Sequence, residues 1–309
     1  MKLFSQVTRF GKKFWRQRYL MLLLLPAVIC LVIFKYIPIA GLQIAFKTYS
    51  FRLGIWGSPW AGLKQFNQMF HDITIVPAVI NTLGISSLKL LFGFPVPIIL
   101  ALLLNEVKNL RFKKVVQTIS YFPYFLAYSV VALMLSMLLA KTGIINELLL
   151  TLGLLREPYL FLGEAKAFWG VAVVTDIWKG CGWSSIIYLA ALTSISPSLY
   201  ESATIDGAGR LQKMIYITLP GIKATVIVLL IMNIGSIVHG ANFDLSYLLG
   251  NSLNVARSEI LPTYILRTGI GYGRFSYATA VGLVESIVSL ILVFGSNALS
   301  KAFLGEGLF

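Results

Sequence analysis

Ionisable side chains interrupt otherwise apolar stretches of the sequence, among them Lys89, Asp176, Lys179 and Glu285. A charge in the middle of a bilayer is costly unless it is paired or wetted, so each residue is a candidate for a polar path through a membrane. Asp176 and Lys179 are one helical turn apart and can pair with each other, which we favour over a role in solute binding. Glu285 has no evident partner nearby in the sequence and can face the path or a neighbouring chain.

A second group of polar residues lies toward the end of the apolar stretch near 220–240, with Phe243 and Tyr247 close by. Recognition of a polar solute requires hydrogen-bonding groups, and aromatic faces add a stacking surface; this region supplies both. The candidate residues of a solute path are Asn233, His239, Asn242, Asp244, Glu285 and Asp176.

Catalysis by this chain has little support in the sequence. His71 and His239 are the only histidines, and Cys30 and Cys181 have no metal-like spacing. We find no paired carboxylates and no arrangement of a nucleophile with a base. The Gly-x-x-x-x-Gly-Lys-Ser/Thr pattern of a nucleotide-binding loop is also absent, so any ATP must be bound by another protein. We therefore expect no enzyme activity, metal or cofactor in this chain, and a membrane-bound enzyme is disfavoured.

The elements that position these residues are apolar helices. Of the 309 residues, 57% are hydrophobic and 12% are charged, which indicates an integral membrane protein. A span of ~30 Å of hydrocarbon takes roughly 20 residues. We predict an all-α membrane protein with six spans, at about 19–39, 78–104, 116–140, 168–194, 220–240 and 276–299. Prolines 95 and 97 in the second span and Pro123 in the third are expected to bend their helices.

The distribution of positive charge predicts the topology. Residues 1–18 contain six basic side chains and no acid, and the loop 105–115 contains four against one. Short basic loops remain cytoplasmic, so the two termini and residues 201–220 are expected inside, and 40–77, 141–167 and 241–275 outside. We divide the chain into a basic N-terminal segment (1–18, an interfacial helix), a membrane domain (19–300) and a short tail (301–309). The net charge of +14 then reflects topology and lipid headgroups, not nucleic acid.

Residues 199–220 form a polar island between two apolar stretches. We predict a short helix at 199–206, a turn at Gly207 and a second helix at 208–218, with Pro220 opening the next span. Ala208, Leu211 and Ile215 recur every three or four residues and form an apolar stripe on the second helix. Such a helix pair suits a groove on a soluble partner. It also suits a position on the lipid surface, and composition leaves both possibilities open.

The island resembles the EAA loop of ABC importer permeases. The matching pattern is Glu201-x-Ala203-x-x-Asp206-Gly207-Ala208, followed by Ile217, Leu219 and Pro220, with Ser202 in place of the usual alanine. Other stretches resemble the carbohydrate-type permeases that work with a large lipoprotein binding protein: FKYIP (34–38), GSPW (57–60), FGFP (92–95), ALLLNE (101–106), DIWK (176–179) and YATAVG (277–282).

The resemblance implies a type I importer permease in a bacterial cell membrane. Its partners would be a second homologous permease, cytoplasmic subunits that bind ATP and Mg, and an extracytoplasmic solute-binding lipoprotein. The solute would be a carbohydrate, most simply a complex oligosaccharide or polysaccharide fragment. In that family the loop inserts into the ATPase, so the implied coupling residues are Glu201, Ala203, Asp206, Gly207, Ala208, Leu211 and Ile215.

Two alternatives to a carbohydrate importer remain at this stage. The first is a permease of the same type for another solute. The second is a self-contained secondary transporter or channel, in which the intramembrane charges would carry ions. Secondary transporters commonly contain an internal repeat, and the sequence contains no convincing one.

Overall fold

The computed structural model describes residues 17–240, 242–305 and 307. Over these residues the chain is helical, apart from loops and one isolated antiparallel bridge between Lys47 and Trp60. Most of the predicted N-terminal segment, residues 1–16, lies outside the described part. The expected tail begins within a helix, because α19 (Phe275–Leu304) continues past residue 301.

Three helical runs are long and apolar enough to cross a membrane: Arg18–Phe46, Ile73–Glu106 and Phe275–Ala302. Two bent pairs pass the same test together, Leu110–Phe125 with Tyr128–Leu138 and Arg210–Gly221 with Lys223–Gly235. The described residues thus contain three to five candidate spans by length and composition. This number is smaller than the six spans that the sequence predicts. The predicted span at 168–194 is a continuous helix, α11 (Phe168–Leu192), which is not among the candidates.

The second predicted span is one long run of three segments. These are α6 (Val76–Leu88), the π-helical η4 (Lys89–Gly93) and α7 (Pro95–Glu106). Pro95 occupies the start of α7, where a missing amide is tolerated more easily than in a helix interior. A π-helical turn in the middle of a helix often marks a functional position, and this one begins at a lysine.

The third predicted span is broken. It consists of α8 (Leu110–Tyr121), the 3-10 turn η5 (Phe122–Phe125) and α9 (Tyr128–Leu138), and the two halves differ in direction by 99°. Pro123 lies in η5, and the backbone is extended at Leu126 and Ala127. The expected proline bend is therefore a change of direction between two helices.

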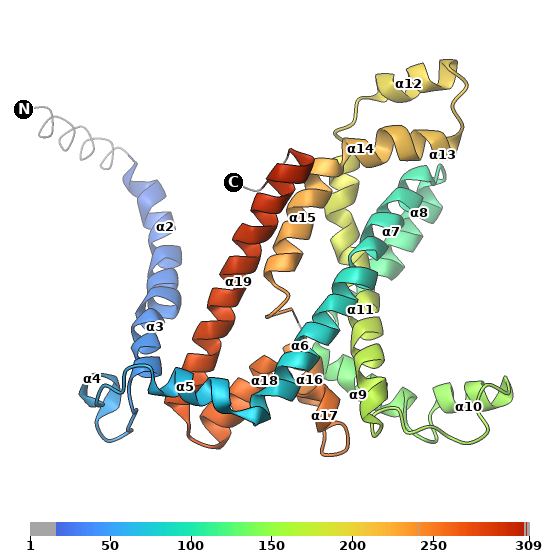
Figure 1. Cartoon of the computed structure of the whole chain (residues 1–309). Coiled ribbons are helices and arrows are strands. Elements are labelled where there is room, and N and C mark those ends of the chain that lie inside the picture. The colour runs from blue at the N-terminus through green and yellow to red at the C-terminus, as the bar shows by residue number, and fades with distance from the viewer. Residues whose placement is uncertain (1–16, 241, 306, 308–309) are drawn as a thin grey trace, which may run out of the picture.

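The membrane helices pack in pairs around a divided core. α7 packs along α11, and α15 (Lys223–Gly235) packs along α19 (Figure 1). The approach of α11 to α8 requires glycine, since a Cβ on Gly182 would lie 2.0 Å from the carbonyl oxygen of Ser120. Tyr188 packs with Leu102 and Ile222 in one of the buried clusters.

The first helical run stands apart from this bundle (Figure 1). It comprises α2 (Arg18–Leu31), η1 (Val32–Tyr36), α3 (Ile37–Ile39) and η2 (Ala40–Phe46). The first three segments bury no residue. The run meets the bundle at one end, where η2 packs against α19.

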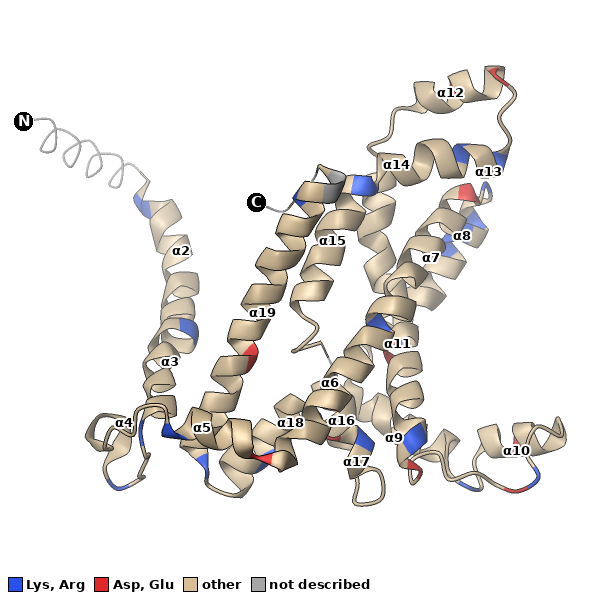
Figure 2. Cartoon of the chain, viewed as in Figure 1, with Lys and Arg blue, Asp and Glu red and all other residues tan. Residues whose placement is uncertain are grey.

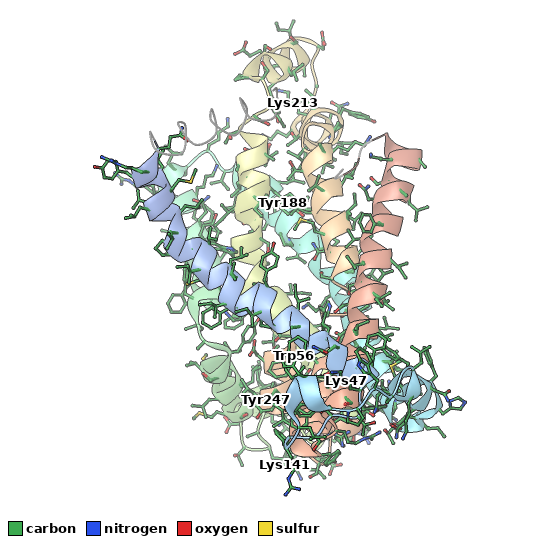
Figure 3. The ribbon with its side chains drawn as sticks, turned by 90° about the vertical axis from the view of Figure 1, so that its left-hand side faces the viewer. Lys47, Trp56, Lys141, Tyr188, Lys213 and Tyr247 are labelled. Carbon is green, nitrogen blue, oxygen red and sulfur yellow. The ribbon has the colours of Figure 1, made fainter. Side chains whose placement is uncertain are left out.

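Short helices gather at the end of the bundle where η2 lies (Figure 1). They are α4 (Gly54–Gly57), α5 (Lys64–His71), η3 (Ile73–Ile75), α10 (Ile144–Thr151), η6 (Ala165–Ala167), α16 (Phe243–Leu249), α17 (Val255–Ser258), α18 (Leu261–Leu266) and η8 (Arg267–Gly271). The opposite end carries α12 (Pro197–Ile205), α13 (Arg210–Lys213), η7 (Met214–Thr218) and α14 (Leu219–Gly221). Lys213 accordingly lies far from Trp56 and Lys141, with Tyr188 at an intermediate depth (Figure 3).

Candidate functional site

The polar island forms two helices joined by a tight turn, as the sequence predicts. Gly207 has a φ of +79°, a left-handed conformation that glycine adopts readily. The second helix begins at Arg210, two residues later than expected, and the amide of Gly209 donates to Gln212 Oε1 at 2.7 Å. Pro220 does not open the next span as predicted. It lies in α14, before a 61° bend, and the span begins at Lys223.

Side-chain hydrogen bonds join the two helices of the island. Lys213 Nζ donates to Thr204 Oγ1 at 2.7 Å, and the hydroxyls of Tyr200 and Thr218 share a hydrogen bond at 3.0 Å. The amide of Ala208 donates to the carbonyl of Ala203 at 2.8 Å across the turn. These contacts hold α12 against α13 and η7.

The predicted coupling residues lie on the surface of the island. Glu201, Asp206 and Gly207 are exposed, while Ala203 and Ala208 are partly buried. The side chains of Leu211 and Ile215 are 63% and 44% exposed. Two large apolar side chains on a helix that projects beyond the membrane helices suit a partner's groove. Their role in coupling stays a prediction.

A cavity of about 230 Å³ lies among the membrane helices. Two of the predicted path residues, Asp176 and Asn233, line it. The other polar groups around it come from α6, η4, α11 and the end of α15: Ser86, Lys89, Ser184, Tyr188 and Ser236. The cavity therefore offers hydroxyl, amide and charged groups within an apolar wall.

Asp176 pairs with Lys89 and not with Lys179, so the predicted local pair is wrong. The Asp176 carboxylate also accepts hydrogen bonds from the Tyr128 hydroxyl at 3.2 Å and from Asn242 Nδ2. Asn242 thus belongs to this cluster as a hydrogen-bond donor to Asp176. Its own side-chain oxygen accepts from the amide of Leu245 and caps α16.

Lys179 has a different partner because the third span is broken. Its ammonium group donates to the carbonyl oxygens of Pro123 at 3.3 Å and Tyr124 at 2.7 Å. It also lies 5.4 Å from the centre of the Tyr124 ring and 4.6 Å from that of Tyr128. A break in a membrane helix frees carbonyl groups that need donors, and this lysine supplies them.

The remaining path candidates do not line the cavity. Glu285, on α19, is 5% exposed, and its Oε1 lies 2.9 Å from His239 Nδ1. The sequence suggested no partner for Glu285, and the structure supplies one that is distant along the chain. Asp244 is exposed in the first turn of α16. The six candidates are therefore divided between the cavity cluster, the Glu285–His239 pair and the surface.

Sequence reasoning missed Lys89, Ser86 and Tyr188 as members of this site. Lys89 stood out as an intramembrane charge but was not grouped with the path residues. Ser86 lies one turn before it, and its buried hydroxyl has no hydrogen-bond partner among the described residues. Two hydrophilic residues three apart on an apolar span were the available signal. Tyr188 gave none, because a tyrosine on a buried helix is ordinary.

A second polar cluster lies at the end with the short helices. Asp72 accepts hydrogen bonds from the Thr74 hydroxyl at 2.6 Å and the Tyr277 hydroxyl at 2.8 Å. Arg274 Nη1 lies 3.9 Å from the same carboxylate. Burial acts to raise the pKa of Asp72. The hydrogen bonds and the guanidinium charge outweigh burial and hold this pKa below the ordinary aspartate value of 3.8. This network joins η3 to α19.

Residues 93–304 match the protein family described as binding-protein-dependent transport system inner membrane component. The chain is 45% identical over 295 residues to protein LplB of Bacillus subtilis, with 95% of this chain and 92% of LplB covered. It is 46% identical over 298 residues to the polygalacturonan/rhamnogalacturonan transport system permease protein YteP of the same organism, with 96% and 92% covered.

The fold is similar to that of a solved bacterial ABC transporter involved in the import of the acidic polysaccharide alginate. The TM-score is 0.86 at 39% identity, over 96% of this chain and 99% of that one. A chain in the structure of that type of transporter in complex with an alginate pentasaccharide-bound periplasmic protein gives a TM-score of 0.87 at 38% identity, over 97% and 100%.

Proposed function

The chain belongs to the family of binding-protein-dependent transport system inner membrane components, and we propose that it is a permease subunit of an ATP-driven carbohydrate importer. Its solute is a complex oligosaccharide or polysaccharide fragment. The observation that carries this proposal is the similarity along nearly the whole chain to a permease and a transporter named for polysaccharides. The hydroxyl and amide groups around the membrane cavity are the chemistry that a sugar requires.

The arrangement of helices supports the six-span topology of a type I permease. If each bent pair counts as one span, and α11 as another, the three uninterrupted runs bring the total to six. Basic residues of α8 lie at the same end as α12 and α13 (Figure 2), which agrees with a cytoplasmic location for that end. With six spans, both termini are cytoplasmic. The protein itself lies in the membrane of a bacterial cell.

The island transmits movement from the ATPase to the path. ATP and Mg bind to separate cytoplasmic subunits, one of which receives Leu211 and Ile215 in a groove. When those subunits close, α12 moves together with α13 and η7 because side-chain hydrogen bonds join them. η7 and α14 continue from α13 to the bend before α15. Since Asn233 on α15 lines the cavity, this movement reaches the solute path.

The solute passes between this chain and a second, homologous permease. An extracytoplasmic binding lipoprotein delivers the solute to the end formed by the short helices. It docks there on the segments 40–77, 141–167 and 241–275. Asp176 and Asn233 contribute to the path directly, and Asn242 contributes by holding Asp176. This chain supplies one wall of the path, and the partner supplies the other.

Affinity purification of the gently solubilised chain tests the assembly. We expect a second permease and an ATP-binding subunit to be recovered, and the ATP-binding subunit to be lost when Glu201 and Gly207 are replaced. The recovered complex should import saccharides into liposomes only with ATP. A chain that is recovered alone and transports without ATP would be a self-contained transporter. ATP-driven uptake of a different solute class, with no saccharide uptake, would establish a permease of the same type for that solute.

A further inference from the structure

Lys89 presents a positive charge to the cavity. It begins the π-helical segment η4, and its ammonium group pairs with Asp176 and donates to the carbonyl oxygen of Gly240 at 2.6 Å. The Lys89 side chain is 28% exposed, whereas that of Asp176 is 9% exposed. Of the two paired side chains, that of Lys89 is therefore the more accessible.

Asp176 does not depend on Lys89 alone. The Tyr128 hydroxyl and Asn242 Nδ2 both donate to its Oδ1, while Lys89 is paired with Oδ2. A buried carboxylate that loses its only partner is strongly destabilising. Here the carboxylate keeps two donors if Lys89 moves away, so Lys89 is the member of the pair that can exchange its partner.

The cavity also contains hydroxyl groups without partners. Ser86 is 4% exposed, and its Oγ makes no hydrogen bond with any described residue. Tyr188 is 3% exposed and lines the cavity from α11, and no hydrogen bond to its hydroxyl is formed within the described part of the chain. Buried polar groups normally have partners. A bound molecule rich in hydroxyl groups would provide them.

We propose that Lys89 selects acidic saccharides by exchanging Asp176 for a carboxylate of the solute. The solute unit that fits is a uronic acid, with its carboxylate on Lys89 and its hydroxyls near Ser86 and Tyr188. A neutral sugar gains the hydroxyl contacts but no ion pair, so Lys89 remains with Asp176. This inference rests on the proposed function and adds to it the charge class of the solute.

Equilibrium binding to the assembled transporter tests this role. The complex is placed in lipid nanodiscs without its binding protein, so that only the membrane subunits discriminate. Calorimetric titration with trigalacturonate is compared with titration of its methyl ester, which keeps the chain length and loses the charge. Wild type should prefer the acid. Lys89→Met should weaken binding of the acid about tenfold and binding of the ester less than about twofold, and Lys89→Arg should retain the preference.

A structural role for the Lys89–Asp176 pair would give a different result. Lys89→Met would then weaken both saccharides equally, and that outcome overturns the inference, as does a wild type that binds neither or binds both alike. If Lys89→Met does not fold, the variant with Lys89→Met and Asp176→Asn, which removes both charges, takes its place. ATP-driven uptake is measured on the same complexes. A wild-type complex that takes up saccharides normally but binds the acid no better than the ester overturns this inference alone. Absence of saccharide uptake by the wild-type complex overturns the proposed function as well.

Discussion

Lys213 donates a hydrogen bond to Thr204 across the Gly207 turn, with 2.7 Å between Nζ and Oγ1. The contact joins α12 to α13 at the point where the chain reverses. Together with the hydrogen bond between Tyr200 and Thr218, it makes the island a single body that projects from the membrane helices. We therefore expect a push on its apolar stripe to be passed to η7 and α14 and not to be absorbed by the turn.

The first prediction concerns the turn itself. Gly207→Val should uncouple ATP hydrolysis from uptake, because a β-branched residue at a φ of +79° is strained by about 1–3 kcal/mol. No neighbouring atom lies within 4 Å of an added Cβ, so the effect comes from backbone strain alone. ATPase activity and saccharide uptake are measured on the same reconstituted complex.

Gly209→Ala is the matched control for Gly207→Val. Its φ is −71°, and an added Cβ would lie 3.6 Å from Gln212 Oε1, an ordinary contact. We expect this variant to transport normally. Wild-type uptake by Gly207→Val would show that the turn does not couple the two activities.

The second prediction concerns the exposed apolar stripe. Leu211→Asp should reduce recovery of the ATP-binding subunit in affinity purification at least about tenfold, since burying a carboxylate in an apolar groove is costly. The isolated chain should keep its thermal stability, because Leu211 is 63% exposed within it. Undiminished recovery of the ATP-binding subunit would exclude Leu211 from the interface.

The third prediction concerns the broken span. Lys179→Met removes the donor for the carbonyl groups of Pro123 and Tyr124. An unsatisfied buried carbonyl costs about 1–3 kcal/mol, so the thermal unfolding midpoint of the solubilised chain should fall by several degrees. Lys35→Met is the control, because Lys35 is exposed on η1. Equal midpoints for the two variants would argue against this role for Lys179.

The fourth prediction concerns acid stability. Because the folded pKa of Asp72 is lowered below 3.8, its ionised form stabilises the fold above that pH, and the stabilisation is lost as the pH falls through the lowered value. Asp72→Asn should thus cost about 1–3 kcal/mol near pH 7, and the difference from wild type should shrink in acid. The free energy of unfolding of wild type and of Asp72→Asn, measured near pH 7 and in acid, checks this prediction.

Glu157→Gln serves as the control for Asp72, since Glu157 is an exposed carboxylate. Its stability should follow that of wild type at both pH values. A constant deficit of Asp72→Asn from neutral to acid pH would mean that the lost contacts do not depend on the charge of Asp72.

Local patterns predicted the helical membrane class, the positions of the apolar stretches and the turn at Gly207. Hydropathy and the conformational freedom of glycine act over a few residues, so a sequence reveals them directly. The 99° break after Pro123 was only hinted at by the proline. A bend of that size depends on donors from elsewhere in the chain, and here Lys179 provides them.

The partners of the intramembrane charges could not be read from the sequence. Lys179 is one turn from Asp176, and spacing alone favours that pair. Folding brings Lys89 to Asp176 and His239 to Glu285 from other helices instead. Such contacts depend on how helices pack, and one sequence carries no record of them.

The isolated position of the first helical run bears on how the protein is made. α2, η1 and α3 bury no residue, so this run can enter the bilayer on its hydropathy alone, while the rest of the chain is still being synthesised. The contact that holds this run against the bundle forms later, because it involves α19. η2 packs against α19, and the amide of Tyr49 donates to Ser276 Oγ at 2.9 Å. This run, which comes early in the described part of the chain, therefore gains its contacts with α19 only after most of the membrane helices have been synthesised.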